Sequence, residues 1–254
     1  MSGPVLDLAL PAVIDGPVEL NFALAAPVDV EVVSDFRALI GDVLTIAAHG
    51  AFVAQAYHPT ASTLRLVAEQ PHPTGFTLQC EVTKLDHRFA RVVRNLCVMY
   101  SKVTHEVHSF RAQVRGARST GLIPLKPDDT SGAYPPRSDK LGFPFRIGDD
   151  GEYRGPRCAE LNFAGGLGDE LADELIALFV AWGNVSLGGF AASEAELSRG
   201  DCAIFEVDPD LRDDVTLEVP ISMFGAPVCA WNPFLNLCGT LNRTRAGLRG
   251  VEIS

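Results

Sequence analysis

The sequence predicts an α+β protein built as a tandem duplication of one ferredoxin-like βαββαβ unit, with antiparallel sheets, helices on one face of each sheet and a pseudo-two-fold relation between the copies. Two repeats predict the duplication. The pentapeptide at 19–23 recurs at 160–164, and the tripeptide at 95–97 recurs at 236–238 at the same spacing along the chain. The third observation is that helical and strand-like periodicities follow both copies in the same order. The alternative is one unrepeated α+β domain with accidental similarities.

In the first half, alternation of apolar and polar residues predicts strands and apolar residues at helical spacing predict helices. Gly50 ends the first helix, and Asp86 is expected to cap the second. The expected elements are a strand, a helix, two hairpin strands, a helix and a strand: 18–23, 32–47, 51–70, 77–83, 86–100 and 108–114.

The second half repeats this order. Its first helix runs into a glycine pair at 188–189, and Asn232 and Pro233 are expected as the N-cap and first residue of its second helix. The expected elements are again a strand, a helix, two hairpin strands, a helix and a strand: 159–164, 171–182, 190–207, 216–222, 232–241 and 248–253.

These patterns divide the chain into two halves, 1–114 and 158–254, joined by a connecting segment at 115–157. The connecting segment is rich in Pro, Gly, Asp and Arg and has no sustained period. We interpret it as a linker, and the alternative is a segment that wraps the surface or covers a site.

The chain is acidic, with 32 Asp and Glu against 21 Lys and Arg, a formal net charge of −11. Nucleic acid is therefore not an expected partner, because its binding depends on clustered cations. Residues 158–254 alone hold 15 acidic and 5 basic residues. That concentration suits either a cationic partner or simply solubility.

No run of the sequence approaches the roughly 18 apolar residues that cross a bilayer, and the N-terminal segment lacks a basic region typical of a signal peptide. A cytoplasmic protein that does not bind membranes is expected. The six cysteines form no C-x-x-C pair, so buried reduced thiols are expected and no metal or cofactor is predicted.

Strand alternation assigns side chains to the sheet face that the helices leave open. In the first half this face is expected to carry Glu19, Asn21, Glu81 and Arg111, with Arg111 balancing the two carboxylates. In the second half it is expected to carry four residues and no cation: Glu160, Asn162, Glu218 and Glu252. Like charges on neighbouring strands are unfavourable unless compensated, so this face is either an acidic surface that binds a cation or a solvated face.

Three functions remain open. The first is a non-catalytic acidic protein, possibly an inhibitor or immunity protein of a bacterial toxin, that recognises a cationic protein or small molecule. Its partner-binding candidates are Asn21, Asn162, Glu218 and Glu252.

The second is a small-molecule enzyme with acid–base carboxylates in a cleft between the halves. Its catalytic candidates are Glu19, Glu81, Arg111 and Glu160. The third is an assembly role in which the open face packs on another subunit. The sequence lacks G-x-S-x-G, phosphate-loop and dinucleotide motifs, and it leaves the oligomeric state open. Arg88, Arg91 and Arg94 are expected on a solvated helix face, and the alternative is that they hold an anion there.

Overall fold

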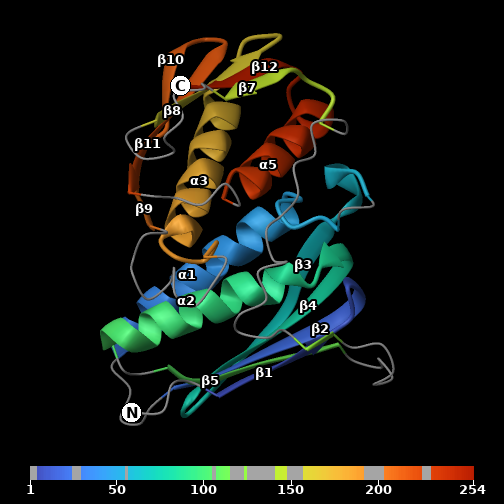
Figure 1. Cartoon of the computed structure of the whole chain (residues 1–254), viewed down its shortest axis with the longest axis vertical. Coiled ribbons are helices and arrows are strands. Elements are labelled where there is room, and N and C mark those ends of the chain that lie inside the picture. Colours follow the sequence, from blue (N-terminus) through green and yellow to red (C-terminus); the bar gives the residue numbers. More distant parts are fainter. Residues whose placement is uncertain are drawn as a thin grey trace.

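The protein is an α+β structure with two mainly antiparallel sheets, seen in a computed structural model (Figure 1). The α1–α2 pair and the α3–α5 pair lie between the two sheets, which form the outer ends of the molecule. The structure describes residues 5–24, 30–54, 57–104, 107–114, 123–124, 141–147, 157–191, 203–224 and 230–254.

The first sheet has the strand order β3-β4-β2-β5-β1-β6. Its strands are β1 (Val5–Leu10), β2 (Val13–Leu24), β3 (Thr63–His72), β4 (Gly75–Asp86), β5 (Val107–Val114) and β6 (Ile123–Pro124). The β1–β5 pair is parallel, and the other pairs are antiparallel. The helices of this half are α1 (Val30–Ala48), α2 (Arg88–Thr104) and the short 3-10 turn η1 (Pro59–Ala61). As expected for the strand at 18–23, β2 lies between β4 and β5.

The second sheet has the order β10-β11-β8-β12-β7, and β9 also pairs with β11. Its strands are β7 (Phe145–Ile147), β8 (Arg157–Phe163), β9 (Ala203–Val207), β10 (Asp210–Asp213), β11 (Thr216–Phe224) and β12 (Leu248–Ile253). The helices are α3 (Asp169–Ser186) and α5 (Trp231–Thr244). Strand β8 lies between β11 and β12, and β7 adds to β12 in parallel, as β1 adds to β5 in the first sheet.

The connecting segment contributes to both sheets within the part of it that the structure describes. Strand β6 pairs with β1, and β7 pairs with β12. Leu141, just before β7, is fully buried, and the Asn242 side-chain amide donates a hydrogen bond to the Gly142 carbonyl at 3.3 Å. The segment around 141–147 is therefore packed as part of the second half and is more than a linker.

The core of the first half is organised around Phe22 on β2. Its ring centroid lies 4.7 Å from that of Phe76 and 5.1 Å from that of Phe110, and both pairs are stacked. Phe36 of α1 meets the Phe22 ring edge-on at 5.5 Å. Phe22 thus joins three strands to a helix, which is why the alternation along β2 fixes which of its faces is buried.

Aromatic side chains also join the helices of the second half. The ring of Trp182 lies 5.9 Å from that of Trp231 and 5.0 Å from that of Phe234. The Trp182 indole N–H donates to the Ala230 carbonyl at 3.3 Å, so this buried polar group is satisfied. The pair of helices α3 and α5 is therefore fixed by packing and by one buried hydrogen bond.

The two halves meet through their helices and the turns that follow them. The Asn95 side chain of α2 donates to the carbonyls of Gly189 and Ala191, at 3.0 and 2.9 Å. Asn236 of α5 donates to the Ala51 carbonyl at 2.9 Å. One continuous apolar core contains residues of both halves. In each half, an asparagine on the second helix thus binds the turn that follows the first helix of the other half.

This packing corrects the expected cleft between the halves. Since the helices of both halves lie in the middle, the helix-free faces of the two sheets point away from each other (Figure 1). Glu19 on β2 and Glu160 on β8 both lie on these outward faces, because their neighbours Leu20 and Leu161 are fully buried against the helices. The acid–base site that required Glu19 and Glu160 to converge is therefore not formed.

The three arginines of α2 are not on a solvated face, so that prediction is wrong. Arg91 and Arg94 are only 5% and 4% exposed. Arg88 is largely buried, with its Nε 3.4 Å from Asp86 Oδ1. Helix α2 packs on its own sheet with one side and contacts the turn at 189–191 of the other half through Asn95. A single apolar stripe in the sequence does not reveal that second contact.

The helix starts were predicted with mixed success. Asp86 Oδ1 accepts a hydrogen bond at 2.9 Å from the backbone N–H of Arg88, the first residue of α2, so it satisfies an early N–H of the helix from one residue before the N-cap position. Helix α5, however, begins at Trp231 with Ala230 as N-cap and no side-chain cap. Asn232 and Pro233 thus lie inside its first turn, a position where proline is tolerated because the early N–H groups have no helical acceptor.

Replacing Asp42 by asparagine is expected to stabilise the protein slightly at neutral pH. Burial between α1 and α3 raises the pKa of Asp42 above its usual 3.8, although a hydrogen bond from Asn184 Nδ2 at 2.8 Å partly opposes this. A raised folded-state pKa contributes stability that is present below 3.8 and is lost as the pH rises through the folded value.

The gain from Asp42→Asn should therefore appear at neutral pH and vanish below the ordinary pKa of an aspartate, as measured by urea unfolding across pH. Asp35→Asn, at an exposed position of the same helix, is the control. An equal gain from both variants, or a gain that persists in acid, would show that desolvation of Asp42 is not the cause.

Candidate functional site

A row of charged residues crosses the outward face of the second sheet. The Cα partners across neighbouring strands run from Asp210 to Glu218, Glu160, Glu252 and finally Arg146. We call the four carboxylates Asp210, Glu218, Glu160 and Glu252 the acidic row. Direct cross-strand neighbours have Cβ atoms about 5 Å apart, so these carboxylates form one continuous surface.

Two described guanidiniums lie on this face, which corrects the expectation that it carries no cation: Arg146, the Cα partner of Glu252, and Arg212 of β10. Arg212 Nη1 is 3.2 Å from Glu160 Oε1 and 3.1 Å from Glu218 Oε1. Its Nε is 3.9 Å from Asp213 Oδ2. Glu160, first among these neighbours, and Glu218 raise the pKa of Arg212 above its ordinary value. Two of the four carboxylates are thus compensated from within the chain.

Arg212 was missed because β10 is irregular. The register between β10 and β11 shifts between Leu211 and Asp213, so Arg212 occupies a bulge. A bulge adds a residue to one strand and breaks the alternation by which side chains are assigned to faces. The sequence around 208–214 reads as a solvated turn, and no signal in it distinguishes a bulged edge strand from such a turn.

Other described side chains of this outward face lie on either side of the acidic row. In the next row, Asn162 Oδ1 accepts a hydrogen bond from Thr216 Oγ1 at 3.3 Å. On the other side of the acidic row lies Cys158, whose thiol has a raised pKa because of burial first and then the charges of Glu218 and Glu160. Asn162 is therefore part of a structural hydrogen bond beside the acidic row.

The first sheet repeats part of this arrangement on its outward face. Thr77 Oγ1 donates to Asn21 Oδ1, and Asn21 Nδ2 donates to Glu19 Oε1 at 3.1 Å. The Thr–Asn bond is thus the same in both halves. The Cα partner of Glu19 on β4 is the neutral Gln79, whereas the Cα partner of Glu160 on β11 is Glu218. The first sheet therefore lacks the pair of neighbouring glutamates on which the acidic row is built.

The remaining candidates of the first half lie on the same face but not side by side. Glu81 has Pro17 and Arg65 as Cα partners, whereas Arg111 has Asn21 and Asp7. Glu19 lies between them along the strands. The structure therefore brings Glu19, Glu81 and Arg111 onto one sheet face and leaves Glu160 on the other sheet.

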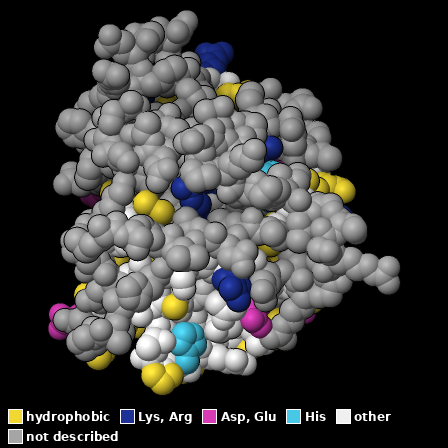
Figure 2. All heavy atoms as spheres, turned by 60° about the horizontal axis from the view of Figure 1, so that its bottom comes forward, with side chains coloured by type: hydrophobic (Ala, Val, Ile, Leu, Met, Phe, Trp, Pro, Cys, Tyr) yellow, Lys and Arg dark blue, Asp and Glu magenta, His cyan; other side chains and the backbone are white. Residues whose placement is uncertain are grey.

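Figure 2 turns the end formed by the first sheet toward the reader. The described hydrophobic side chains on this side are scattered among basic, acidic and histidine side chains, and those drawn in colour form no continuous apolar patch. The visible part of this surface does not resemble the apolar centre of a stable subunit interface.

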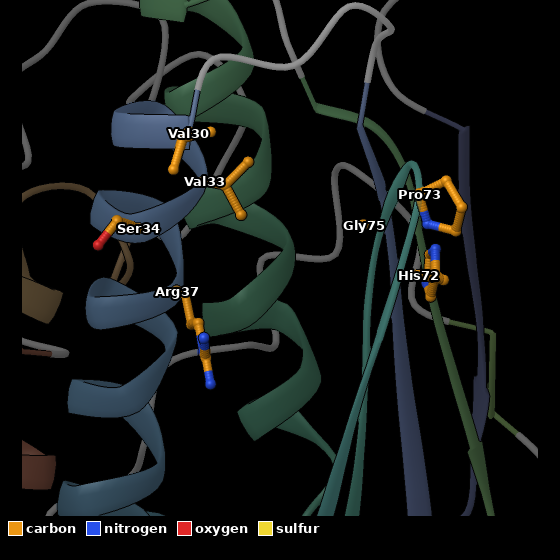
Figure 3. A pocket seen from close by; sticks show the side chains of 7 residues that line it. All are labelled: Val30, Val33, Ser34, Arg37, His72, Pro73 and Gly75. Atoms are coloured by element: carbon orange, nitrogen blue, oxygen red, sulfur yellow. The ribbon is translucent and has the colours of Figure 1, made fainter.

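A groove of about 420 Å³ lies between the start of α1 and the β3–β4 hairpin (Figure 3). Val30, Val33 and Arg37 line it from α1, and His72 and Pro73 line it from the hairpin. Arg37 forms a two-pronged contact with Glu69, with both N–O distances 2.6 Å. Because its guanidinium is already paired, the groove offers no obvious anion site.

Neither a metal-binding cluster nor a helix that could cross a membrane occurs among the described residues. They contain no group of three or more His, Cys, Asp or Glu side chains placed to hold one metal ion. Among the helices described, none has the length and apolar character needed to cross a bilayer.

The comparisons with known proteins do not identify a family. No protein-family model and no curated protein matches the chain. Among solved structures, the chain is similar to a DyP-type peroxidase from Cellulomonas bogoriensis, at 13% sequence identity, covering 97% of this chain and 93% of that one, with a TM-score of 0.22. A superposition that loose carries no argument about fold or function.

Proposed function

We propose that the protein is a non-catalytic binding protein that recognises a cationic partner through the acidic row of its second sheet. An inhibitor or immunity protein is the kind of protein that fits. One observation carries the proposal: Asp210, Glu218, Glu160 and Glu252 are neighbours on four adjacent strands of an outward-facing sheet. Like charges in direct cross-strand contact cost stability, and a cationic partner would relieve that cost.

The local charge supports this choice of partner. Arg212 compensates two members of the acidic row and Arg146 neighbours a third, while Asp208, Asp213 and Asp214 add exposed carboxylates in and beside β10. The surface therefore stays acidic after its internal ion pairs are formed. The electrostatic field of an acidic surface accelerates the approach of a basic partner and orients it.

The proposal includes a tandem duplication of a ferredoxin-like unit as the origin of the fold. Its support is the shared strand order, the strand added in parallel to the last strand of each sheet, and the Thr–Asn hydrogen bond that occurs at equivalent places in both halves. In this view the acidic row is specific to the second copy. A reducing compartment such as the cytoplasm suits the protein, since the four described cysteines are free thiols.

A triple variant with Glu160→Gln, Glu218→Gln and Glu252→Gln tests the proposal. Binding of basic proteins from a native-host extract should fall by about tenfold, as expected for the loss of three exposed charge contacts of about 0.5 kcal/mol each. High salt should weaken the wild-type complex in the same way.

The matched control removes three negative charges at another place on the surface. Asp169→Asn, Glu170→Gln and Asp173→Asn alter three exposed carboxylates at the start of α3. If both triple variants lose binding equally, net charge alone is responsible. If neither loses binding and the wild type is insensitive to salt, the protein does not recognise a cation through this face.

A further inference from the structure

Arg212 lies where a cationic ligand of the acidic row would lie. Its Nη1 is within hydrogen-bond distance of carboxylate oxygens on two neighbouring strands, Glu160 on β8 and Glu218 on β11. The chain therefore shows which group fits between these two carboxylates: a guanidinium nitrogen that bridges them.

The contact is exchangeable. The Arg212 side chain is 49% exposed, and β10 is the outer strand of the sheet order. Because Arg212 occupies a bulge, its side chain can leave the face without breaking the neighbouring backbone pairs. Exposed ion pairs contribute little to stability, so displacing this side chain from the carboxylates is not costly.

The acidic row has acceptors beyond those that Arg212 uses. Glu252 is the Cα partner of Glu160 on the side away from β11, and Asp210 flanks Glu218 on the other side. Arg146 is the other Cα partner of Glu252, but among the ion pairs formed by the residues described, none joins Glu252 or Asp210 to a cation. A planar guanidinium has five N–H donors in a fixed fork, two more than an ammonium, so a partner arginine can keep contacts with more carboxylates of the row at once.

We propose that Arg212 is an internal competitor for the acidic row and that the group recognised in the partner is an arginine side chain, which displaces it. This inference rests on the proposed function. It adds which chemical group of the partner is bound and how Arg212 regulates that binding. Arg212 keeps the glutamates paired in the free protein and sets the threshold that a partner must exceed. Because this exposed ion pair is weak, the threshold is low, and a segment with several arginines exceeds it more readily than a single cation does.

The test measures the affinity of the full chain for a short arginine–glycine repeat peptide and for its lysine–glycine counterpart. The wild type should prefer the arginine peptide. Arg212→Gln should tighten binding of that peptide about two- to fivefold, the factor that corresponds to removing one exposed ion pair. Arg212→Lys, which keeps the charge but loses the planar fork, should lie between the two.

Arg245→Gln is the matched control. Arg245 is 51% exposed and is paired with Glu174 at 2.9 Å, so the variant removes the same charge from a similar ion pair away from the acidic row. It should leave the affinity unchanged. An affinity for Arg212→Gln that is unchanged, weaker, or raised no more than that of Arg245→Gln would overturn the inference, as would an equal or greater affinity of the wild type for the lysine peptide.

The two proposals fail in different ways. If the triple glutamine variant of the acidic row binds the arginine peptide as well as the wild type does, the proposed function is wrong, and this inference falls with it. If that variant loses binding while Arg212→Gln gains none, the acidic row is a binding surface but Arg212 does not compete for it.

Discussion

Replacing Phe22 by alanine is expected to lower the free energy of unfolding by about 3–5 kcal/mol, the usual cost of removing a buried phenylalanine ring. Phe22 is fully buried and contacts the rings of Phe76, Phe110 and Phe36. Its loss opens a cavity where three strands meet α1. The change is a large part of the 5–15 kcal/mol that typically stabilises a domain.

Chemical denaturation followed by circular dichroism measures this change. Phe22→Leu is the control, since it keeps an apolar side chain at the site and should cost markedly less. A loss below about 1 kcal/mol for Phe22→Ala would mean that the ring is not at the centre of the first core.

The second large effect is expected for Gly50→Ala, at the end of α1. Gly50 has a φ of +83°, and a Cβ placed there would lie 2.6 Å from the Pro59 carbonyl oxygen and 2.6 Å from Thr240 Oγ1 of the other half. The left-handed conformation alone costs a non-glycine residue about 1–2 kcal/mol. Together with the displacement of backbone at Pro59, we expect a loss of about 2–4 kcal/mol.

Gly41→Ala provides a control in the same helix. A Cβ at Gly41 meets nothing within 4 Å, so alanine should stabilise the helix by about 0.5–1 kcal/mol. The two variants should therefore change the midpoint of thermal unfolding in opposite directions. Shifts of the same sign and size would contradict the close contact between the halves at Gly50.

Local features of the fold were predictable because they depend on local patterns. The alternation along β2 and β8 placed Glu19 and Glu160 opposite the buried Leu20 and Leu161, as the structure confirms. The central position of β2 and β8 also agreed with expectation. These inferences needed only the period of a strand and the order of the elements.

The arrangement of the halves could not be predicted in the same way. It depends on contacts such as Asn95 with Gly189 and Asn236 with Ala51, which join residues far apart in the sequence. A buried asparagine amide on a helix looks like any polar residue until its acceptor is known. The sequence therefore suggested a shared cleft where the structure has packed helices.

Arg91 and Arg212 illustrate the same limit for charged residues. Arg91 is buried because α2 is covered on more than one side, and Arg212 reaches the acidic row because of a bulge. Both outcomes depend on tertiary packing or on an irregularity that breaks the strand period. Composition predicted an acidic second half, but the geometry of the site depends on where one guanidinium lies.

Chemical labelling of carboxyl groups, read by mass spectrometry with and without the arginine-repeat peptide, tests the location of the binding surface most directly. We expect the peptide to protect Glu160, Glu218 and Glu252 from labelling while Asp169, Glu170 and Asp173 react as before. Protection confined to the start of α3, or no protection on β8, β11 and β12, would contradict the assignment of the acidic row as the surface that binds a cation.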